Sequence, residues 1–262
     1  MTDMRTIPTA ALVTGATSGI GEAFARALPE STALLLTGRD EAALGRLAGE
    51  LGSSGSGRLV ETVGADLATG EGLDAVAEAA ERFAVDLFVC NAGTSPYGDF
   101  LRADEDALLA TVAVNVVAPT VLLRRLLPGM IERAEAAGSR AGVIVVSSGL
   151  GFVPTPRLAA YAASKAFDLS LAEALGAELT GRPVDVLALC PTITRSRFAE
   201  RSGFGRTPPG AQRPSHVARS ALSALGRQRT LVLGPISGSV LAVPALVRAG
   251  LAQGLQAVLP RR

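Results

Sequence analysis

Short apolar segments alternate with amphipathic segments along most of the chain. The apolar segments contain few polar positions, which is typical of strands buried on both faces of a parallel sheet. They predict strands over 11–14, 33–37, 59–64, 86–90, 142–147, 184–189 and 231–233. Between them, the amphipathic segments predict helices that include 21–28, 41–51, 72–83, 105–133 and 158–179. This alternation predicts an α/β fold with a doubly wound, seven-stranded parallel sheet flanked by helices.

No internal repeat and no linker divides the sequence, so residues 1–262 are expected to form a single domain. The Ser/Gly-rich stretch 53–57 is interpreted as a surface loop. Residues 236–262 are interpreted as an apolar helical extension that covers the pocket or a partner subunit. A membrane span needs about 20 apolar residues, and Pro244 and several glycines interrupt this one. We therefore expect no integral membrane span, with peripheral membrane association as the alternative.

Composition narrows the class of protein. A formal net charge of +1 argues against a nucleic-acid-binding protein, which normally carries a clustered basic excess. Cys90, Cys190 and the single histidine, His216, have no spacing that suits zinc, so no metal site is expected. Nothing indicates a disulfide framework or a signal peptide, so a reducing cytoplasm is the expected location.

The chain has one lysine, Lys165, and it lies four residues after Tyr161, one of only two tyrosines. Positions i and i+4 share one face of a helix. An ammonium there stabilises a phenolate and lowers the pKa of the tyrosine from its ordinary value of about 10. A single Tyr–Lys pair with this spacing also occurs by chance on surface helices, so a catalytic role for it depends on matching residues elsewhere in the chain.

A glycine-rich turn follows the first predicted strand. Gly15, Gly19 and Gly21 open the next helix, where glycines let a pyrophosphate approach backbone amides at the positive helix end. After the second strand, Gly38 stands where an acidic residue would bind a free ribose 2′-hydroxyl. Arg39 follows it, and a guanidinium suits a 2′-phosphate, which favours NADP(H) over NAD(H). The neighbouring Asp40 could neutralise part of that charge.

Together these elements resemble the short-chain dehydrogenase/reductase superfamily, of its classical type, over roughly residues 8–235. TGATSGIG matches the family's TGxxxGxG turn, and Cys90-Asn91-Ala92-Gly93 resembles its NNAG element. Ser148 precedes Tyr161 by the family's spacing of 13 residues, whereas Ser147 does not. The resemblance implies a Rossmann fold and a catalytic tetrad made of Asn115, Ser148, Tyr161 and Lys165.

The same resemblance implies a cofactor site along the carboxyl ends of the strands. Its expected members are Gly15, Thr17, Ser18, Gly19, Ile20, Gly21, Arg39, Asp66, Leu67, Asn91, Ala92, Gly93, Tyr161, Lys165, Pro191, Thr192, Thr194 and Ser196.

The resemblance also implies a role for each member of the tetrad. Tyr161 would act as general acid/base, and Lys165 would lower its pKa and hold the nicotinamide ribose. Ser148 would bind the substrate oxygen, and Asn115 would hold a water that links Lys165 to solvent.

Three positions depart from the family pattern. Cys90 replaces the first Asn of NNAG, and a buried Cys there behaves as a small hydrophobic residue. In the segment that resembles PGxxxT, Thr192 replaces the glycine and adds a Cβ beside the nicotinamide site. Ser196 replaces the final threonine and keeps the hydroxyl. None of these changes removes a group that the reaction requires.

We therefore expect an NADP(H)-dependent oxidoreductase that interconverts a carbonyl and an alcohol. Residues expected to face an apolar ketone or aldehyde are 94–97, 149–152, Pro154, Leu158 and the segment 194–213, which is interpreted as a mobile lid. The five arginines of that last segment leave an anionic substrate open as an alternative. The family usually forms homodimers or homotetramers through its long helices, so a homo-oligomer is expected. Alternatives are a non-catalytic NADP(H) sensor and an epimerase or dehydratase that uses the same residues.

Overall fold

A computed structural model describes residues 7–53, 57–195 and 210–234. Within these residues, seven strands form one sheet in the order β3-β2-β1-β4-β5-β6-β7, and every neighbouring pair is parallel. The strands are β1 (Ala10–Thr14), β2 (Ala33–Gly38), β3 (Val60–Gly64), β4 (Leu87–Cys90), β5 (Ala141–Val146), β6 (Val184–Pro191) and β7 (Thr230–Leu233). The predicted doubly wound sheet is confirmed, with each strand within one or two residues of its expected ends.

The helices cover more of the chain than the sequence predicted. They are α1 (Gly19–Ala27), α2 (Glu41–Gly52), α3 (Gly70–Arg82), α4 (Glu105–Val112), α5 (Ala118–Ala137), α6 (Ala159–Glu178) and α8 (Pro214–Ala224). Short 3₁₀ turns lie at η1 (Phe100–Arg102) and η3 (Gly149–Phe152). The segment predicted as one helix over 105–133 is interrupted by a π-helical turn, η2 (Ala113–Val117).

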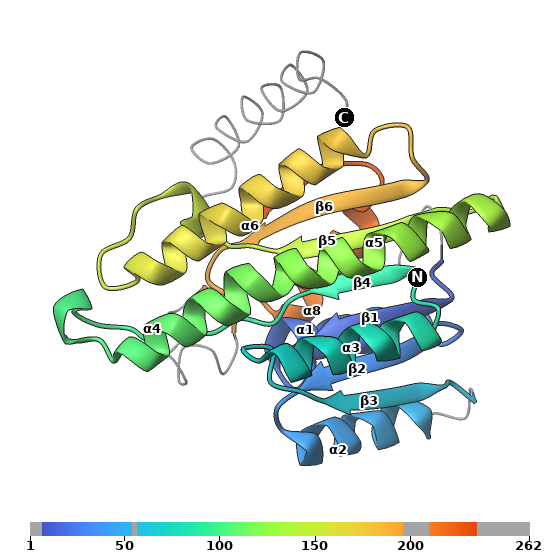
Figure 1. Ribbon diagram of the computed structural model, residues 1–262, viewed down its shortest axis with the longest axis horizontal. Coiled ribbons are helices and arrows are strands. Elements are labelled where there is room, and N and C mark those ends of the chain that lie inside the picture. Colours follow the sequence, from blue (N-terminus) through green and yellow to red (C-terminus); the bar gives the residue numbers. More distant parts are fainter. Residues whose placement is uncertain (1–6, 54–56, 196–209, 235–262) are drawn as a thin grey trace.

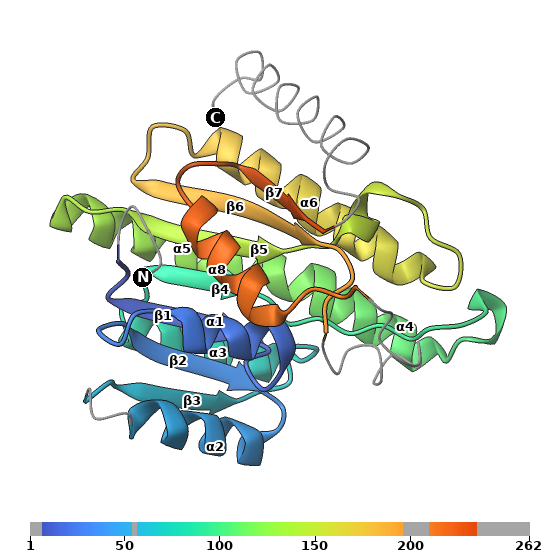
Figure 2. The ribbon, with the colours of Figure 1, turned by 180° about the vertical axis from the view of Figure 1, so that it is seen from behind.

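Two layers of helices enclose the sheet (Figures 1 and 2). Helices α3, α5 and α6 cover the face seen in Figure 1, and α1 and α8 cover the opposite face seen in Figure 2. Each face has its own apolar core cluster. The central strands therefore contribute side chains to both clusters, which explains why their sequences are apolar at every position.

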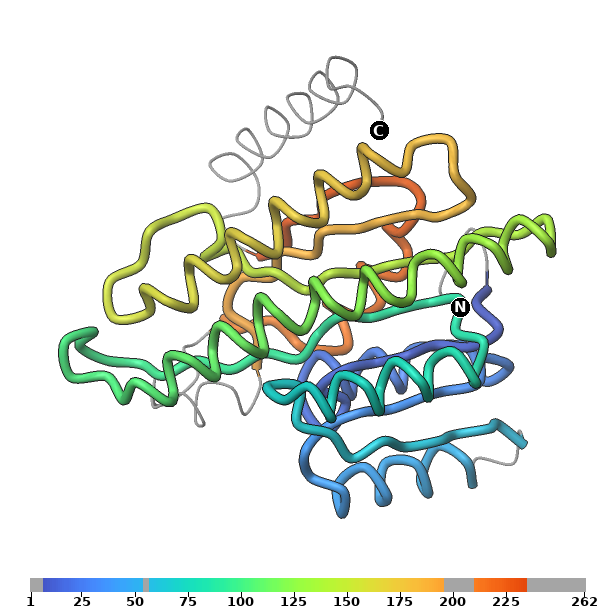
Figure 3. The backbone as a smooth tube through the Cα atoms, viewed as in Figure 1, coloured from blue at the N-terminus to red at the C-terminus, as the bar shows by residue number. Residues whose placement is uncertain are grey.

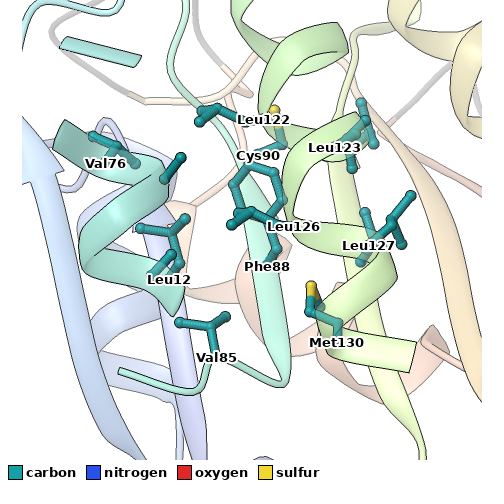
Figure 4. Packing of buried hydrophobic residues seen from close by; sticks show 14 of the residues in the cluster. Leu12, Val76, Val85, Phe88, Cys90, Leu122, Leu123, Leu126, Leu127 and Met130 are labelled. Carbon is teal, nitrogen blue, oxygen red and sulfur yellow. The ribbon is translucent and has the colours of Figure 1, made fainter. Parts of the chain in front are cut away.

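The cluster between the sheet and helices α3 and α5 is built around Phe88 (Figure 4). Phe88 is completely buried and points from β4 toward Leu126 of α5. Cys90, two residues along the same strand, lies on the same face beside Leu122. This packing fixes the end of β4, where the site residues begin.

Strand β3 departs from the apolar pattern because it is an edge strand. Its residues are half-buried or exposed, whereas all of β5 is buried. The chain crosses from β3 to β4 through α3 (Figure 3), and this crossover starts the second half of the sheet beside β1. Strands β1 and β4 thus flank the point where the strand order reverses, the place where open α/β sheets bind ligands.

The helical run Glu105–Ala137 is long and apolar enough to cross a membrane by length and composition alone. Core helices of water-soluble proteins meet the same criterion, so this is weak evidence for a span.

Candidate active site

The turn between β1 and α1 closes in a way that only glycine permits. Gly15 and Gly19 have φ values of 66° and 62°, in the left-handed region. A Cβ on Gly15 would lie 3.0 Å from the side-chain nitrogen of Asn91, and a Cβ on Gly21 would collide with the carbonyl oxygen of Gly15. The missing side chains let the turn pack closely against the loop after β4. The turn leads into the N-terminus of α1, whose backbone N–H groups fit a pyrophosphate.

Asn91 and Thr14 hold this turn against the end of β4. The Thr14 Oγ1 accepts hydrogen bonds from the N–H groups of Asn91 (2.9 Å) and Ala92 (3.0 Å). In return, the Asn91 Nδ2 donates to the carbonyl oxygens of Thr14 (2.9 Å) and Gly15 (3.3 Å). The glycine turn is therefore held in place by the residues that follow β4. Gly93 comes next and is exposed.

Thr17, Ser18 and Ile20, which were predicted to bind the cofactor, lie in three different environments. Ser18 is the N-cap residue of α1, and Ile20 packs against the core cluster of α1. Thr17 faces the end of β2, since a Cβ on Gly38 would lie 3.0 Å from its Cγ2. Gly38 thus leaves the space that Thr17 occupies.

Arg39 is exposed at the carboxyl end of β2, beside the turn. Asp40 caps α2 instead of pairing with it, because its Oδ1 accepts a hydrogen bond from the Ala43 N–H at 2.9 Å. Among residues 7–53, 57–195 and 210–234, no carboxylate lies within ion-pair distance of Arg39. Arg39 is therefore exposed at the strand end and forms no ion pair with Asp40.

Asp66 and Leu67 follow β3 on the same edge of the sheet. Asp66 is exposed and its Oδ1 accepts a hydrogen bond from the Ala68 N–H at 3.0 Å, whereas Leu67 is buried. The carboxylate orders the loop that leads into α3.

Asn115 lies in the π-helical turn η2 and is buried. Its Nδ2 donates to the Thr94 carbonyl oxygen (2.9 Å) and to the Ser164 Oγ (3.0 Å), and its Oδ1 accepts from the Thr94 N–H (2.9 Å). The side chain thus joins the loop after β4 to helix α6. Extra residues in a helical turn recur at functional sites, and here the turn points Asn115 inward.

The two serines after β5 have different partners. Ser147 donates from its Oγ to the backbone carbonyl of Lys165 at 2.6 Å, so it anchors α6. Ser148 is the next residue and has an extended backbone. Its Oγ accepts a hydrogen bond from the Leu150 N–H, and its side chain forms a hydrogen bond with Tyr161. Ser148 is therefore the serine that lies beside the phenol.

Lys165 is buried at the centre of the site, with its Nζ 5.8 Å from the centroid of the Tyr161 ring. The ammonium donates to the Val146 carbonyl oxygen (2.9 Å) and to the Oδ2 of Asp168 (2.8 Å). Burial alone would lower the pKa of Lys165, but Asp168 and the Tyr161 phenol raise it, and the net direction is upward. Lys165 is thus held as a cation.

The pKa of Tyr161 is raised, contrary to the direction expected from the Tyr161–Lys165 pair alone. Burial is the largest cause, and it outweighs the charge of Lys165 and the hydrogen bond with Ser148, both of which lower this pKa. The carboxylate of Asp168 raises it further. The phenol is therefore protonated at neutral pH.

At the end of β6, Pro191 is buried and Thr192 takes a defined position. Its N–H donates to the Leu233 carbonyl oxygen at 2.8 Å, and its Oγ1 accepts from Gln212 at 3.4 Å. A Cβ on Gly234 would collide with the Thr192 side chain.

Thr192 therefore fits in place of the family's glycine because Gly234 follows β7. The Oγ1 of Thr194 donates to the Thr192 carbonyl oxygen.

Several expected residues lie outside the part that the structure describes. These are Ser196, most of the segment 194–213, and the extension 236–262. Within the described part, the segment 94–97 follows β4, and η3 and Leu158 lie on the approach to α6.

The two cysteines lie in the described part of the chain, and that part was also searched for possible metal ligands. Cys90 and Cys190 are free and buried. Burial raises the pKa of the Cys90 thiol, with Asp168 adding to the effect. No group of three or more His, Cys, Asp or Glu side chains that could hold a metal ion occurs among the described residues.

The sequence analysis missed one residue of this site, Asp168. A signal was present, because Asp168 lies three residues after Lys165 and so shares its helix face. It is 3% exposed, which makes it unlike an ordinary solvated helix carboxylate.

Comparison with known proteins places this geometry in a family. The inactive hydroxysteroid dehydrogenase-like protein 1 of Mus musculus is 33% identical over 221 residues, 82% of this chain and 65% of that protein. The chain thus spans less than two thirds of that relative. Galactitol 2-dehydrogenase (L-tagatose-forming) of Cereibacter sphaeroides is 35% identical over 243 residues, 86% of this chain and 91% of that protein.

A solved structure shares the whole architecture. The short-chain dehydrogenase from Sphingobium yanoikuyae in complex with NADPH superposes with a TM-score of 0.80 at 29% identity, covering 96% of each chain. A sequence model of the short chain dehydrogenase family matches residues 9–204. The chain, with its parallel sheet, glycine turn and Tyr161–Lys165 pair, therefore belongs to the short chain dehydrogenase family of oxidoreductases.

Proposed function

We propose that this protein is an NADP(H)-dependent oxidoreductase that reduces a ketone or aldehyde to an alcohol, or catalyses the reverse reaction. The observation that carries the proposal is the position of Ser148, Tyr161 and Lys165 around one point beyond the carboxyl ends of β4 and β5. The glycine turn lies beside that point. A bound NADPH would supply the hydride that reaches the carbonyl carbon.

The proton comes from the protein. Tyr161 donates the phenolic proton to the carbonyl oxygen as that oxygen gains negative charge, and Ser148 hydrogen-bonds the same oxygen. The raised pKa of Tyr161 keeps the phenol protonated, which suits the reductive direction. Lys165 lies close enough to contribute a cation beside the phenolate left behind, and proton return from solvent regenerates the phenol.

Asn115 supports the arrangement of Ser148, Tyr161 and Lys165 through its hydrogen bonds. Its side chain fixes Thr94 in the loop after β4 and Ser164 in α6. It thereby holds the loop after β4 against α6, the helix that carries Lys165. A proton path to solvent beside Asn115 is part of the proposal.

The preference for NADP(H) rests on Arg39. Its guanidinium projects from the end of β2, where Gly38 offers no carboxylate for a ribose 2′-hydroxyl. A guanidinium binds a 2′-phosphate through charge-assisted hydrogen bonds. The NADPH complex of the Sphingobium yanoikuyae relative supports the same choice.

The substrate proposed is an apolar carbonyl compound, bound among the residues that follow β4 and β5. A homodimer or homotetramer is proposed through the helical run from α4 to α5 and through α6. Exposed apolar side chains on the first of these surfaces include Leu109 and Val112 of α4 and Val117 of η2. The reducing cytoplasm is the proposed location.

The first test measures oxidation of NADPH and of NADH with a panel of ketones, aldehydes and quinones. Wild type should oxidise NADPH faster than NADH. Tyr161→Phe should lower turnover by roughly 10²–10⁴-fold, the usual contribution of a general acid, while cofactor binding measured by calorimetry is retained. A preference for NADH would contradict the role of Arg39 and leave the reaction class intact.

One rival function has an observation in its favour. Relatives described as inactive are about a third identical to this chain over the aligned residues, so a non-catalytic NADP(H) sensor is the second candidate. Such a sensor would bind NADPH, turn over no substrate, and keep its cellular effect in Tyr161→Phe. An epimerase or dehydratase would instead return the cofactor to its starting redox state after each turnover.

A further inference from the structure

Helix α6 buries an ion pair next to the reacting tyrosine. Lys165 and Asp168 lie three residues apart on one face of the helix, and the Lys165 Nζ is 2.8 Å from the Asp168 Oδ2. Their side chains are only 5% and 4% exposed. The chemistry proposed above uses Lys165 and leaves Asp168 without a role.

The pair restricts where the ammonium can be. An ammonium has three N–H donors, and two of those of Lys165 are given to Asp168 and to the Val146 carbonyl oxygen. Both acceptors are fixed, one on the same helix and the other at the end of β5. The Nζ lies 3.6 Å from where a Cβ of Gly93 would be, so the third donor is beside the loop after β4.

Asp168 also acts on Tyr161 through charge. Lys165 favours the phenolate, and the carboxylate of Asp168 opposes it. The other titratable group near the pair is Cys90, whose thiol is buried at the end of β4 and stays protonated. Tyr161, Lys165 and Asp168 on α6 and Cys90 on β4 are therefore the groups that set the local proton affinity.

The second carboxylate oxygen of Asp168 is also buried. This Oδ1 has no hydrogen-bond partner among the described residues. An unpaired buried oxygen disfavours the carboxylate, and burial accordingly raises the pKa of Asp168 against the opposing effect of Lys165. A buried carboxylate with one unsatisfied oxygen costs stability, so its presence points to a role other than stabilising the fold.

We propose that Asp168 is a positioning residue of this site: its carboxylate anchors the Lys165 ammonium and cancels part of that charge at Tyr161, which keeps the phenol protonated for donation to a carbonyl. This proposal deepens the oxidoreductase function proposed above and rests on it. It assigns part of the control over the protonation state of the Tyr161 phenol to a specific side chain. Without Asp168, the same lysine would hold more of the tyrosine as phenolate.

The composition of the chain makes the proposal directly measurable. Tyr97 and Tyr161 are the only tyrosines, tryptophan is absent, and Lys165 is the only lysine. In protein labelled with ¹³C at the tyrosine Cζ, two signals are expected, and Tyr161→Phe identifies the one that belongs to Tyr161. Its chemical shift followed against pH gives the titration of the phenol without substrate or turnover.

Asp168→Asn is the decisive variant, because it removes the charge and keeps the shape and an acceptor for Lys165. One negative charge fewer beside two groups that release protons should lower the titration midpoint of Tyr161. Asp74→Asn is the matched control, since it breaks an exposed ion pair with Arg125 far from the site and should leave the midpoint unchanged. A midpoint that is unchanged or raised in Asp168→Asn overturns the proposal.

Two further measurements cover the case in which Asp168→Asn does not fold. Asp168→Ser removes the same charge and leaves space for water beside Lys165, and it should move the Tyr161 midpoint in the same direction. In wild-type protein labelled with ¹⁵N at the lysine Nζ, the single ammonium signal should be observable at neutral pH because its protons are buried and hydrogen-bonded. A rapidly exchanging lysine signal would show that the ion pair is absent and would overturn the proposal.

The outcome is separable from that of the proposed function. If Tyr161 titrates as predicted but no carbonyl compound is reduced, the positioning role stands and the reductase function fails. If the reductase is active and the titration midpoint of Tyr161 is the same in Asp168→Asn as in wild type, the function stands and the positioning role fails. With both intact, the pH at which reductase activity declines should be lower in Asp168→Asn than in wild type.

Discussion

One residue, Thr94, holds both polar ends of the Asn115 side chain. The Thr94 N–H donates to Oδ1 and the Thr94 carbonyl oxygen accepts from Nδ2, each at 2.9 Å. This exchange joins the π-helical turn η2 to the loop after β4. The amide is therefore a structural link as well as a member of the predicted tetrad.

Replacing Asn115 with Ala should lower both stability and turnover. The change leaves two backbone groups of Thr94 without their partners. Because Thr94 is half-buried, we expect the two groups together to cost about 1–3 kcal/mol, the range for one fully buried group. Urea unfolding should show a loss in that range, with a larger fall in turnover than in cofactor affinity. Ser164→Ala is the control, because it removes the Asn115–Ser164 bond and the bond from the Ser164 Oγ to the Tyr161 carbonyl oxygen, and keeps both bonds to Thr94. Equal losses in the two variants would contradict the importance of the Thr94 link.

Thr192 and Gly234 should behave as a coupled pair. Gly234→Ala places a methyl group against the Thr192 side chain and also forces alanine into a φ of 129°. We expect a loss of roughly 1–3 kcal/mol in the free energy of unfolding. Adding Thr192→Gly should recover the part due to collision and leave the part due to φ. A double-mutant cycle measures this, and strictly additive losses would show that the two residues are independent.

The sequence predicted the sheet well because its central strands are buried on both faces. A segment such as 142–147 must be apolar at every position in that setting, which makes it easy to recognise. Site residues that follow strands were also predictable, since parallel strands bring their carboxyl ends to one edge. The resemblance to a family supplied the roles.

The sequence alone could not predict features that depend on contacts between residues far apart in the chain or on a local change in backbone hydrogen bonding. The π-helical turn at Asn115 changes the backbone hydrogen bonds and leaves the apolar pattern of the helix nearly unchanged. The fit of Thr192 depends on Gly234, which is remote in sequence and adjacent only because β6 pairs with β7. From the sequence, Asp168 looks like an ordinary charged residue on a helix surface. Only the structure shows that it is buried and paired with Lys165. Helix α8 was not predicted because it follows an Arg- and Pro-rich stretch, although Pro214 at its start is a usual helix signal.

Arg39→Leu should weaken NADPH binding and leave NADH binding nearly unchanged. Charged hydrogen bonds to a phosphate contribute about 1.5–3 kcal/mol, so the dissociation constant of NADPH should rise roughly tenfold or more. Arg46→Leu is the matched control, since Arg46 is an exposed arginine on α2 away from the end of β2. Titration by calorimetry gives the constants for both cofactors. A parallel loss for NADPH and NADH would exclude selective recognition of the 2′-phosphate by Arg39.

Stability should fall at alkaline pH because of the buried site. The pKa values of Tyr161 and Lys165 are both raised in the folded protein, from ordinary values of 10.0 and 10.5. For each group the folded state binds its proton more tightly than the unfolded state. The stabilisation is therefore complete below the unfolded pKa and is lost as pH rises through the folded pKa. The window of loss begins near pH 10.

Urea unfolding at intervals between about pH 8 and pH 11 tests this, since each group changes the free energy of unfolding by up to about 1.4 kcal/mol per pH unit. Tyr161→Phe removes one of the two contributions and should make the alkaline decline shallower. At the lower end of the range both groups are protonated in either state, so comparison there isolates the cost of losing the hydroxyl. A decline of the same slope in the variant would mean that Tyr161 is not held in its protonated form by burial and Asp168.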